Sequence, residues 1–150
     1  MTGEPSLKTR ALGYLARREH SRLELEKKLA SHAQDPAELS AMLDALEQLG
    51  FLSARRMVEQ VVQVRRKKFG SQRIVHELRE KGIDEDLIAA ALPELKETEL
   101  DAAREVWRKK FRAPPADTTE RGRQMRFLLG RGFAPGVIRE VLLCPNKGEA

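Results

Sequence analysis

The sequence predicts an all-α protein built from three tandem three-helix units. Three observations lead to this fold class. Strand signals are missing, because no segment sustains an alternation of apolar and polar residues and no Asn-Gly or Asp-Gly hairpin turn occurs. Residues that begin and end helices recur along the whole chain. Apolar residues with one fixed spacing return three times.

The first helix signals are capping residues, which indicate where individual helices begin and end. Ser21 and Glu24 form a capping box, and Asp35 precedes a first-turn proline. Gly82 suits the left-handed position that follows a helix, and Thr98 is expected to begin a new helix. Nine helices are expected in all, at about residues 7–19, 21–32, 36–49, 53–69, 71–81, 84–95, 98–111, 119–131 and 135–143.

The repeat consists of two apolar positions ten residues apart and a third position four residues later. A spacing of ten crosses a helix-turn-helix junction, and a spacing of four stays on one helical face, so each triple can close a small three-helix core. The triples are Leu29, Leu39 and Leu43; Leu78, Ile88 and Leu92; and Leu128, Ile138 and Leu142. The three units are expected at residues 1–52, 53–97 and 98–150.

Two basic strings follow the same repeat, RRKKFG at residues 65–70 and WRKKFR at residues 107–112. Each would be the last turn of the first helix in its unit, and LARREH at residues 15–20 matches them in the first unit. Phe69 and Phe111 are therefore expected to pack where one helix turns into the next.

The charges of these strings have two interpretations. Cations at a helix C-terminus oppose the macrodipole, which is worth about 0.3–1 kcal/mol each. This explains one or two charges, but it explains poorly the four consecutive cations at residues 65–68. The alternative is a contact with a polyanion or an acidic surface, and a net charge of +5 permits such a partner.

Composition and motifs give little support to an enzyme. KFGSQR lacks the second glycine and the Lys-Ser/Thr of a phosphate-binding loop, and no pair of carboxylates stands out. The three histidines, His20, His32 and His76, lack metal-ligand spacing. The single cysteine, Cys144, is expected to be a small packing residue, and it cannot form an internal disulfide. We therefore expect no catalytic activity, no cofactor and no metal.

Several segments resemble the RecX family, bacterial regulators of the RecA recombinase. They are YLARREHS at residues 14–21, LGFLS at 49–53, RRKKFGSQRIVHELREKGI at 65–83 and RFLLGRGF at 126–133. The resemblance covers roughly residues 7–143. Departures occur at Ser53 and Ala54, where the family usually has acidic residues, and at Gly130, which replaces a helix former.

The resemblance implies an elongated, curved array of three tandem three-helix repeats that lodges in the helical groove of the RecA filament on DNA. There it would inhibit ATP hydrolysis, strand exchange and co-protease activity, and so regulate DNA repair, recombination and the SOS response. A monomer in the cytoplasm is expected, with no membrane association. This localisation also fits the single cysteine and the lack of any run of roughly 18 apolar residues.

Ten cations are candidates for contact with the recombinase filament, or with single- or double-stranded DNA inside it. They are Arg65, Arg66, Lys67, Lys68, Arg73, Arg108, Lys109, Lys110, Arg126 and Arg131. The main alternative function is a stand-alone helix-turn-helix-like DNA-binding protein, since three-helix units with a basic last turn resemble such domains. A nuclease is less favoured, because its metal-binding carboxylates are not visible in the sequence.

Overall fold

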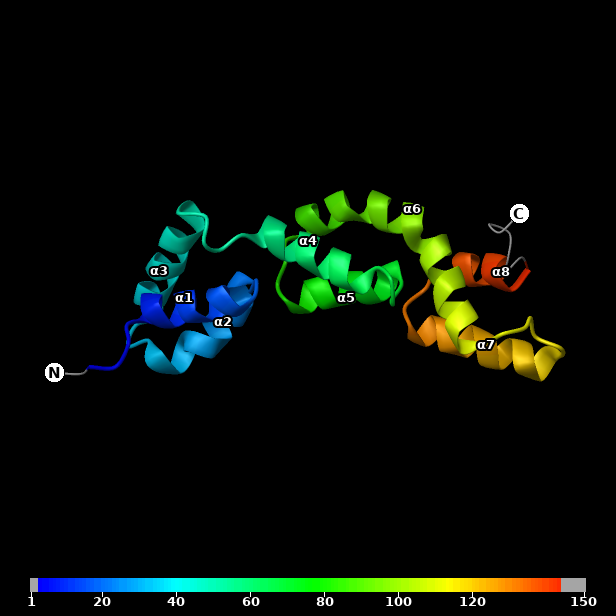
Figure 1. Cartoon of the computed structure of the whole chain (residues 1–150). Coiled ribbons are helices and arrows are strands. Elements are labelled where there is room, and N and C mark those ends of the chain that lie inside the picture. Colours follow the sequence, from blue (N-terminus) through cyan, green and yellow to red (C-terminus); the bar gives the residue numbers. More distant parts are fainter. Residues whose placement is uncertain (1–2, 144–150) are drawn as a thin grey trace.

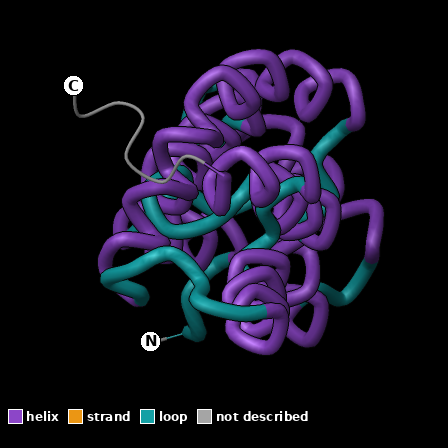
Figure 2. Tube along the Cα trace, turned by 90° about the vertical axis from the view of Figure 1, so that its right-hand side faces the viewer, coloured by secondary structure: helices purple, strands orange, loops and turns teal. Residues whose placement is uncertain are grey.

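The protein is an elongated array of helices, described by a computed structural model over residues 3–143 of the 150. Within that range no strand occurs, so the predicted all-α fold class is confirmed. The α-helices are α1 (Leu7–Arg17), α2 (Arg22–Leu29), α3 (Pro36–Gln48), α4 (Ala54–Arg65), α5 (Ser71–Glu80), α6 (Glu85–Lys110), α7 (Thr118–Gly130) and α8 (Pro135–Leu143), with a 3-10 turn, η1 (Ala30–His32), after α2. Figure 1 shows three groups of helices in a row: α1, α2 and α3 at the N-terminal end, α4, α5 and the first part of α6 in the middle, and the last part of α6 with α7 and α8 at the C-terminal end. Figure 2 shows the array from its C-terminal side, where most of the trace is helical.

Ser21, Glu24, Asp35 and Gly82 begin or end helices as predicted. The hydroxyl of Ser21 accepts a hydrogen bond from the N–H of Glu24 at 3.1 Å, and the carboxylate of Glu24 accepts one from the N–H of Ser21 at 2.9 Å. The carboxylate of Asp35 caps α3 by accepting from a backbone N–H. Gly82 and Gly132 follow α5 and α7 with φ of 76° and 87°, a left-handed conformation that favours glycine. The local sequence therefore determines these helix ends.

One expectation about the helices is wrong, because the two helices predicted at 84–95 and 98–111 are a single helix, α6. Thr98 does not begin a helix, and its hydroxyl instead donates to the carbonyl of Glu94, one turn earlier, at 3.2 Å. Pro93 lies inside α6 and removes one internal hydrogen bond, which accounts for the change of direction of α6 in Figure 1. The helix continues past the proline because Leu95 and Ala103 are buried in two different cores.

The hydrophobic core consists of three separate clusters of buried residues. They draw on residues 7–52, 57–95 and 103–142. Each apolar triple contributes to one cluster, and only Leu92 of the nine residues is partly rather than fully buried. Phe111 is buried in the third cluster, while Phe69 packs at the edge of the second, so both phenylalanines lie at helix junctions as expected. The 26 residues of α6 measure about 39 Å along the bent helix axis and contribute to two of the clusters.

Candidate functional site

The two basic strings, 42 positions apart in the sequence, converge in one groove. Lys67 and Lys68 lie in the turn that follows α4, and Lys109 and Lys110 form the last turn of α6. All four lysines line a single hollow of about 400 Å³. The fourth helix ends at Arg65, four residues earlier than predicted, so the first lysine pair lies on a turn and not on a helix. We call this hollow the basic groove.

Another wall of the basic groove is formed by Phe127 of α7 and by Arg131, the residue that follows α7. The guanidinium of Arg131 lies 5.3 Å from the ring centroid of Phe127 and 5.3 Å from that of Phe69, and it donates to the carbonyl of Lys68 at 3.4 Å. The ammonium of Lys110 lies 5.5 Å from the Phe127 ring. Cations attracted to aromatic rings lose much of their rotational freedom, so Phe127 holds two charges of the groove in place.

The charge of the basic groove is unbalanced. Five cations face one carboxylate, that of Glu105, which pairs with Arg108 at 3.3 Å. In the part of the chain that the structure describes, none of the four groove lysines forms an ion pair with a carboxylate. Helix C-termini stabilise nearby cations, but crowding like charges in one hollow costs free energy. The groove is therefore suited to an anionic ligand.

The ten predicted cations divide into three groups. Five of them meet in the basic groove, namely Lys67, Lys68, Lys109, Lys110 and Arg131. Three arginines pair with carboxylates instead, Arg65 with Glu77 at 3.1 Å, Arg66 with Glu94 at 3.0 Å and Arg108 with Glu105. Arg73 lies 4.1 Å over the ring of Phe69, and Arg126 is exposed on α7.

Sequence reasoning missed Phe127, the aromatic residue of the groove. Its signal was the i, i+4 spacing between Phe127 and Arg131 on one helix, which places the two side chains together.

The groove depends on a close contact between the turn after α4 and the turn after α7. The N–H of Gly70 donates to the carbonyl of Arg131 at 2.8 Å, and the N–H of Gln72 donates to that of Gly132 at 3.1 Å. A Cβ atom at Gly70 would lie 2.3 Å from the carbonyl oxygen of Gly132, and one at Gly132 would lie 2.4 Å from Arg73. Only glycines allow the two backbones to approach this closely.

Glu99 reinforces this contact from α6. Its side chain is buried, with 4% of the residue exposed. The carboxylate accepts from the hydroxyl of Ser71 at 2.8 Å, from the N–H of Ser71 at 3.4 Å and from the N–H of Ala134 at 3.0 Å. These donors lie at the N-termini of α5 and α8, where helix dipoles favour a negative charge. We call this arrangement the Glu99 clamp, and it fixes α5 and α8 against α6.

Ion pairs link the first and second core clusters. Arg56 pairs with Glu19 at 3.1 Å, and Lys81 with Glu24 at 3.5 Å. Burial raises the pKa of Glu24, but hydrogen bonds from Arg18 and the N–H of Ser21, together with the charge of Lys81, outweigh this effect and lower the pKa to about 2. Glu24 is therefore a carboxylate at neutral pH, held between two helices of the first cluster and one of the second.

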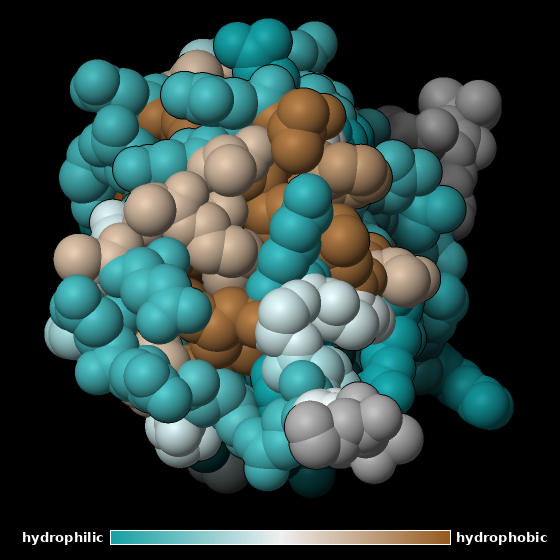
Figure 3. All heavy atoms as spheres, turned by 90° about the vertical axis from the view of Figure 1, so that its left-hand side faces the viewer, coloured by the Kyte–Doolittle hydropathy of each residue, from teal (hydrophilic) through white to brown (hydrophobic). Residues whose placement is uncertain are grey.

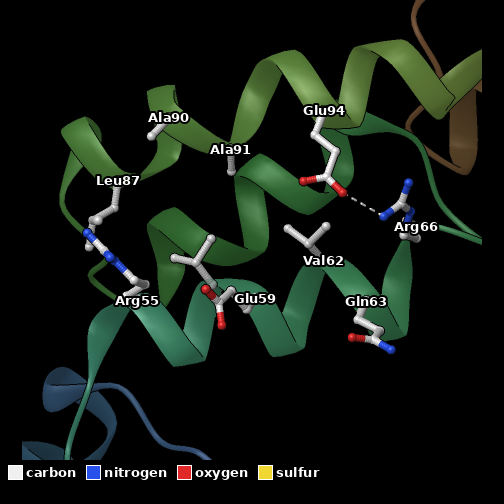
Figure 4. A pocket seen from close by; sticks show the side chains of 10 residues that line it. Arg55, Glu59, Val62, Gln63, Arg66, Leu87, Ala90, Ala91 and Glu94 are labelled. Carbon is white, nitrogen blue, oxygen red and sulfur yellow. Dashed lines mark hydrogen bonds and ion pairs between the residues drawn. The ribbon is translucent and has the colours of Figure 1, made fainter. Parts of the chain in front are cut away.

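A second hollow, of about 520 Å³, lies between α4 and α6 (Figure 4). Its walls include Val62, Leu87 and Ala91, and the ion pair of Arg66 with Glu94 lies at one end. Both signs of charge line this hollow, so it lacks the excess of cations found in the basic groove. Arg66 lines this hollow, and neither Arg66 nor its equivalent in the repeat, Arg108, lines the basic groove.

No group of three His, Cys, Asp or Glu residues within 3–143 could hold a metal ion, and Cys144 lies outside the described residues. None of the described helices is long and apolar enough to cross a membrane. Hydrophobic residues gather in the middle of the face at the N-terminal end of the array, where hydrophilic residues surround them (Figure 3).

Comparison with known proteins relates this chain to one family. The profile of the second three-helix domain of RecX matches residues 55–92, and that of the third matches residues 97–142. A regulatory protein RecX of Leptothrix cholodnii is 56% identical over 137 residues, which cover 91% of this chain and 87% of that protein. One of Herbaspirillum seropedicae is 50% identical over 135 residues, which cover 90% and 88%.

Two solved structures share the fold. The crystal structure of RecX from Lactobacillus salivarius superposes with a TM-score of 0.78 at 19% identity, over 94% of this chain and 95% of that one. A crystal structure of a regulatory protein RecX gives the same TM-score at 21% identity, over 90% of this chain and 70% of that one. From the matching domains and the identity to its relatives, we conclude that the chain belongs to the RecX family of regulatory proteins.

Proposed function

We propose that this chain binds the RecA recombinase filament on DNA and modulates it, mainly by inhibiting ATP hydrolysis, strand exchange and co-protease activity. In this way it would regulate DNA repair and recombination. The observation that carries the proposal is the convergence of both basic strings in one groove of an elongated array, in a chain that belongs to a regulatory family.

The shape supports a clamp that needs no catalysis. Helix α6 measures about 39 Å along its bent axis, and the array extends beyond it at both ends, so the protein could contact neighbouring subunits of a filament. A protein that binds one relative arrangement of subunits more tightly than others shifts the filament toward that arrangement. The rearrangements of subunits that accompany ATP turnover would then be disfavoured. The bound protein would also close the helical groove of the filament to incoming duplex and to a cleaved repressor.

Three further features belong to this proposal. The functional units are residues 1–52, 53–97 and 98–150, a division that the three separate core clusters support. The protein acts as a cytoplasmic monomer. It has no enzymatic turnover and no cofactor of its own, and it inhibits the filament by binding to the filament surface.

The test is a co-sedimentation experiment with three samples: RecA filaments assembled on DNA, RecA without DNA, and DNA without RecA. We expect the protein to sediment with the filaments, to bind free RecA or free DNA more weakly, and to slow the filament ATPase in proportion to the amount bound. Sequence-specific nanomolar binding to DNA without recombinase, with no effect on the ATPase, would instead support the stand-alone DNA-binding function.

A further inference from the structure

We propose that the first three-helix unit is hinged to the rest of the array and that ion pairs hold it in place. The hinge is the turn at residues 49–53, which joins α3 to α4. Two ion pairs cross the joint, Arg56 with Glu19 and Lys81 with Glu24, and we call these four residues the ionic latch. The inference concerns the chain by itself and goes beyond the proposed function.

The joint between the second and third units is rigid by comparison. Helix α6 runs through both units. Two backbone hydrogen bonds also cross this joint, from the N–H of Gly70 to the carbonyl of Arg131 and from the N–H of Gln72 to that of Gly132. The Glu99 clamp adds a buried contact. Turning one unit against the other would break a helix or leave buried polar groups without partners, so these two units move as one body.

The joint between the first and second units lacks these features. No helix is common to both units, because α3 ends at Gln48 and α4 begins at Ala54. In the part of the chain that the structure describes, no backbone hydrogen bond joins residues 3–52 to residues 53–143. The two core clusters share no residue, since the first ends at Leu52 and the second begins at Met57. Each unit therefore keeps its own core when the joint opens.

Arg56 forms the first half of the ionic latch. Its guanidinium donates to the carboxylate of Glu19 at 3.1 Å and to the carbonyls of Gly50 and Phe51 at 2.7 and 3.2 Å. All three acceptors belong to the first unit, so one side chain of α4 holds that unit at two places. The side chain of Arg56 is 44% exposed, so water and salt ions reach it. Exposed ion pairs contribute little to stability and are screened by salt.

Lys81 forms the second half of the ionic latch. Its ammonium lies 3.5 Å from the carboxylate of Glu24, which is longer than an ordinary hydrogen bond. Glu24 also accepts from Arg18 at 2.9 Å, so it keeps a partner inside the first unit when Lys81 moves away. A hollow of about 410 Å³ lies beside this pair, between Arg18 and residues of α4 and α5. The two units are not closely packed here, and opening the joint breaks few contacts.

Opening the latch changes the orientation of the first unit relative to the other two. The basic groove lies wholly in the second and third units. The face on which hydrophobic residues gather lies at the other end of the array, on the first unit (Figure 3). A partner bound to the first unit can therefore take several orientations relative to a partner in the groove. Higher ionic strength screens the latch and widens this range of orientations.

The test measures two distances in the whole protein by double electron–electron resonance. Cys144→Ser removes the native thiol, and spin labels are attached to new cysteines at exposed positions. Labels on Ala41→Cys and Gln63→Cys report the joint between the first and second units. Labels on Gln63→Cys and Glu140→Cys report the joint between the second and third. Both are measured at about 0.1 M and about 1 M salt, between which the screening length falls from about 10 Å to about 3 Å.

Two variants separate the latch from ion pairs in general. The latch variant carries Arg56→Gln and Lys81→Gln, which remove both pairs that cross the joint. The matched control carries Arg66→Gln and Arg79→Gln, which remove two pairs inside the second unit. Both variants lower the net charge by the same amount, and circular dichroism checks that both keep their helices.

The expected result is a change at the first joint only. In the parent, the Ala41–Gln63 distance should have a narrow distribution at low salt and a broad one at high salt. The latch variant should show the broad distribution at both salt concentrations, and the control should match the parent. The Gln63–Glu140 distance should stay narrow in every sample, because packing and not charge holds that joint.

Three results would overturn the inference: an Ala41–Gln63 distribution that stays narrow in the latch variant at high salt, equal broadening at both joints, or broadening in the control equal to that in the latch variant. The first result would mean that packing fixes the first unit as firmly as the other two. If the latch variant does not fold, the salt series on the labelled parent decides by the first two criteria. The samples contain neither recombinase nor DNA, so the outcome is independent of the proposed function.

Discussion

The Glu99 clamp is the contact whose removal tests the description of the groove most directly. Glu99→Ala removes the acceptor for the hydroxyl and N–H of Ser71 and for the N–H of Ala134, and these donors lie in a buried region. We expect the variant to loosen the attachment of α5 and α8 to α6.

The size of the effect follows from the three hydrogen bonds. Each bond to a charged acceptor is worth about 1.5–3 kcal/mol, although the 3.4 Å bond contributes little. The cost of burying the carboxylate offsets part of this gain. The N-termini of α5 and α8 also lose a negative charge, worth about 0.3–1 kcal/mol each. We expect Glu99→Ala to lower the free energy of unfolding by about 3–4 kcal/mol, and Glu99→Gln by about 1–2 kcal/mol, because an amide oxygen can still accept.

Urea denaturation followed by tryptophan fluorescence measures this loss. Trp107 is the only tryptophan, it is buried in the third cluster, and its indole N–H donates to Gln124 at 2.8 Å. Its emission therefore reports the cluster to which the clamp attaches α8. The matched control is Glu97→Ala, an exposed carboxylate two residues away, which we expect to change stability by no more than about 0.5 kcal/mol. A loss below about 1 kcal/mol in Glu99→Ala would refute the argument that the carboxylate holds the junction.

Three further predictions concern the buried core, the two basic strings and the stability of the protein at acid pH. Leu78→Asp should unfold the middle cluster, since an unpaired carboxylate in place of a fully buried leucine costs several kcal/mol, and thermal melting like that of the parent would mean that the repeat register is wrong. Replacing the cations at 65–68, or those at 108–110, by Glu should preserve the helicity measured by circular dichroism but weaken inhibition of the filament ATPase. Inhibition equal to that of the parent across a salt series would mean that the basic strings have only a structural role. The pKa of Glu24 is about 2 in the folded protein, compared with an ordinary value of 4.5. Ionised Glu24 therefore contributes about 3 kcal/mol to the free energy of unfolding above pH 4.5, and this contribution is lost as the pH falls toward 2. Acid titration of Glu24→Gln should lack this loss, and an unchanged acid transition would contradict the assigned ion pairs.

Much of the fold is determined by local sequence. The capping box of Ser21 and Glu24 and the left-handed glycines Gly82 and Gly132 need only their neighbours in the chain, so their positions could be predicted. The apolar triples could be predicted because helical periodicity fixes which side chains share a face. The spacing of the repeat also predicted that both basic strings lie at the end of the first helix of a unit.

The tertiary structure alone decided three features. Helix α6 continues through Pro93 because this buries Leu95 in one cluster and Ala103 in another. The free energy gained by that burial cannot be predicted from the residues around Thr98. The division of the cations depends on which carboxylates lie across from them: Glu94, 28 positions from Arg66, binds that arginine. The groove itself forms because Glu99 joins helix ends 28 and 35 positions away, and contacts over such separations depend on how whole units pack. The sequence placed positive charge at each repeat, and packing brought two of these charged ends together.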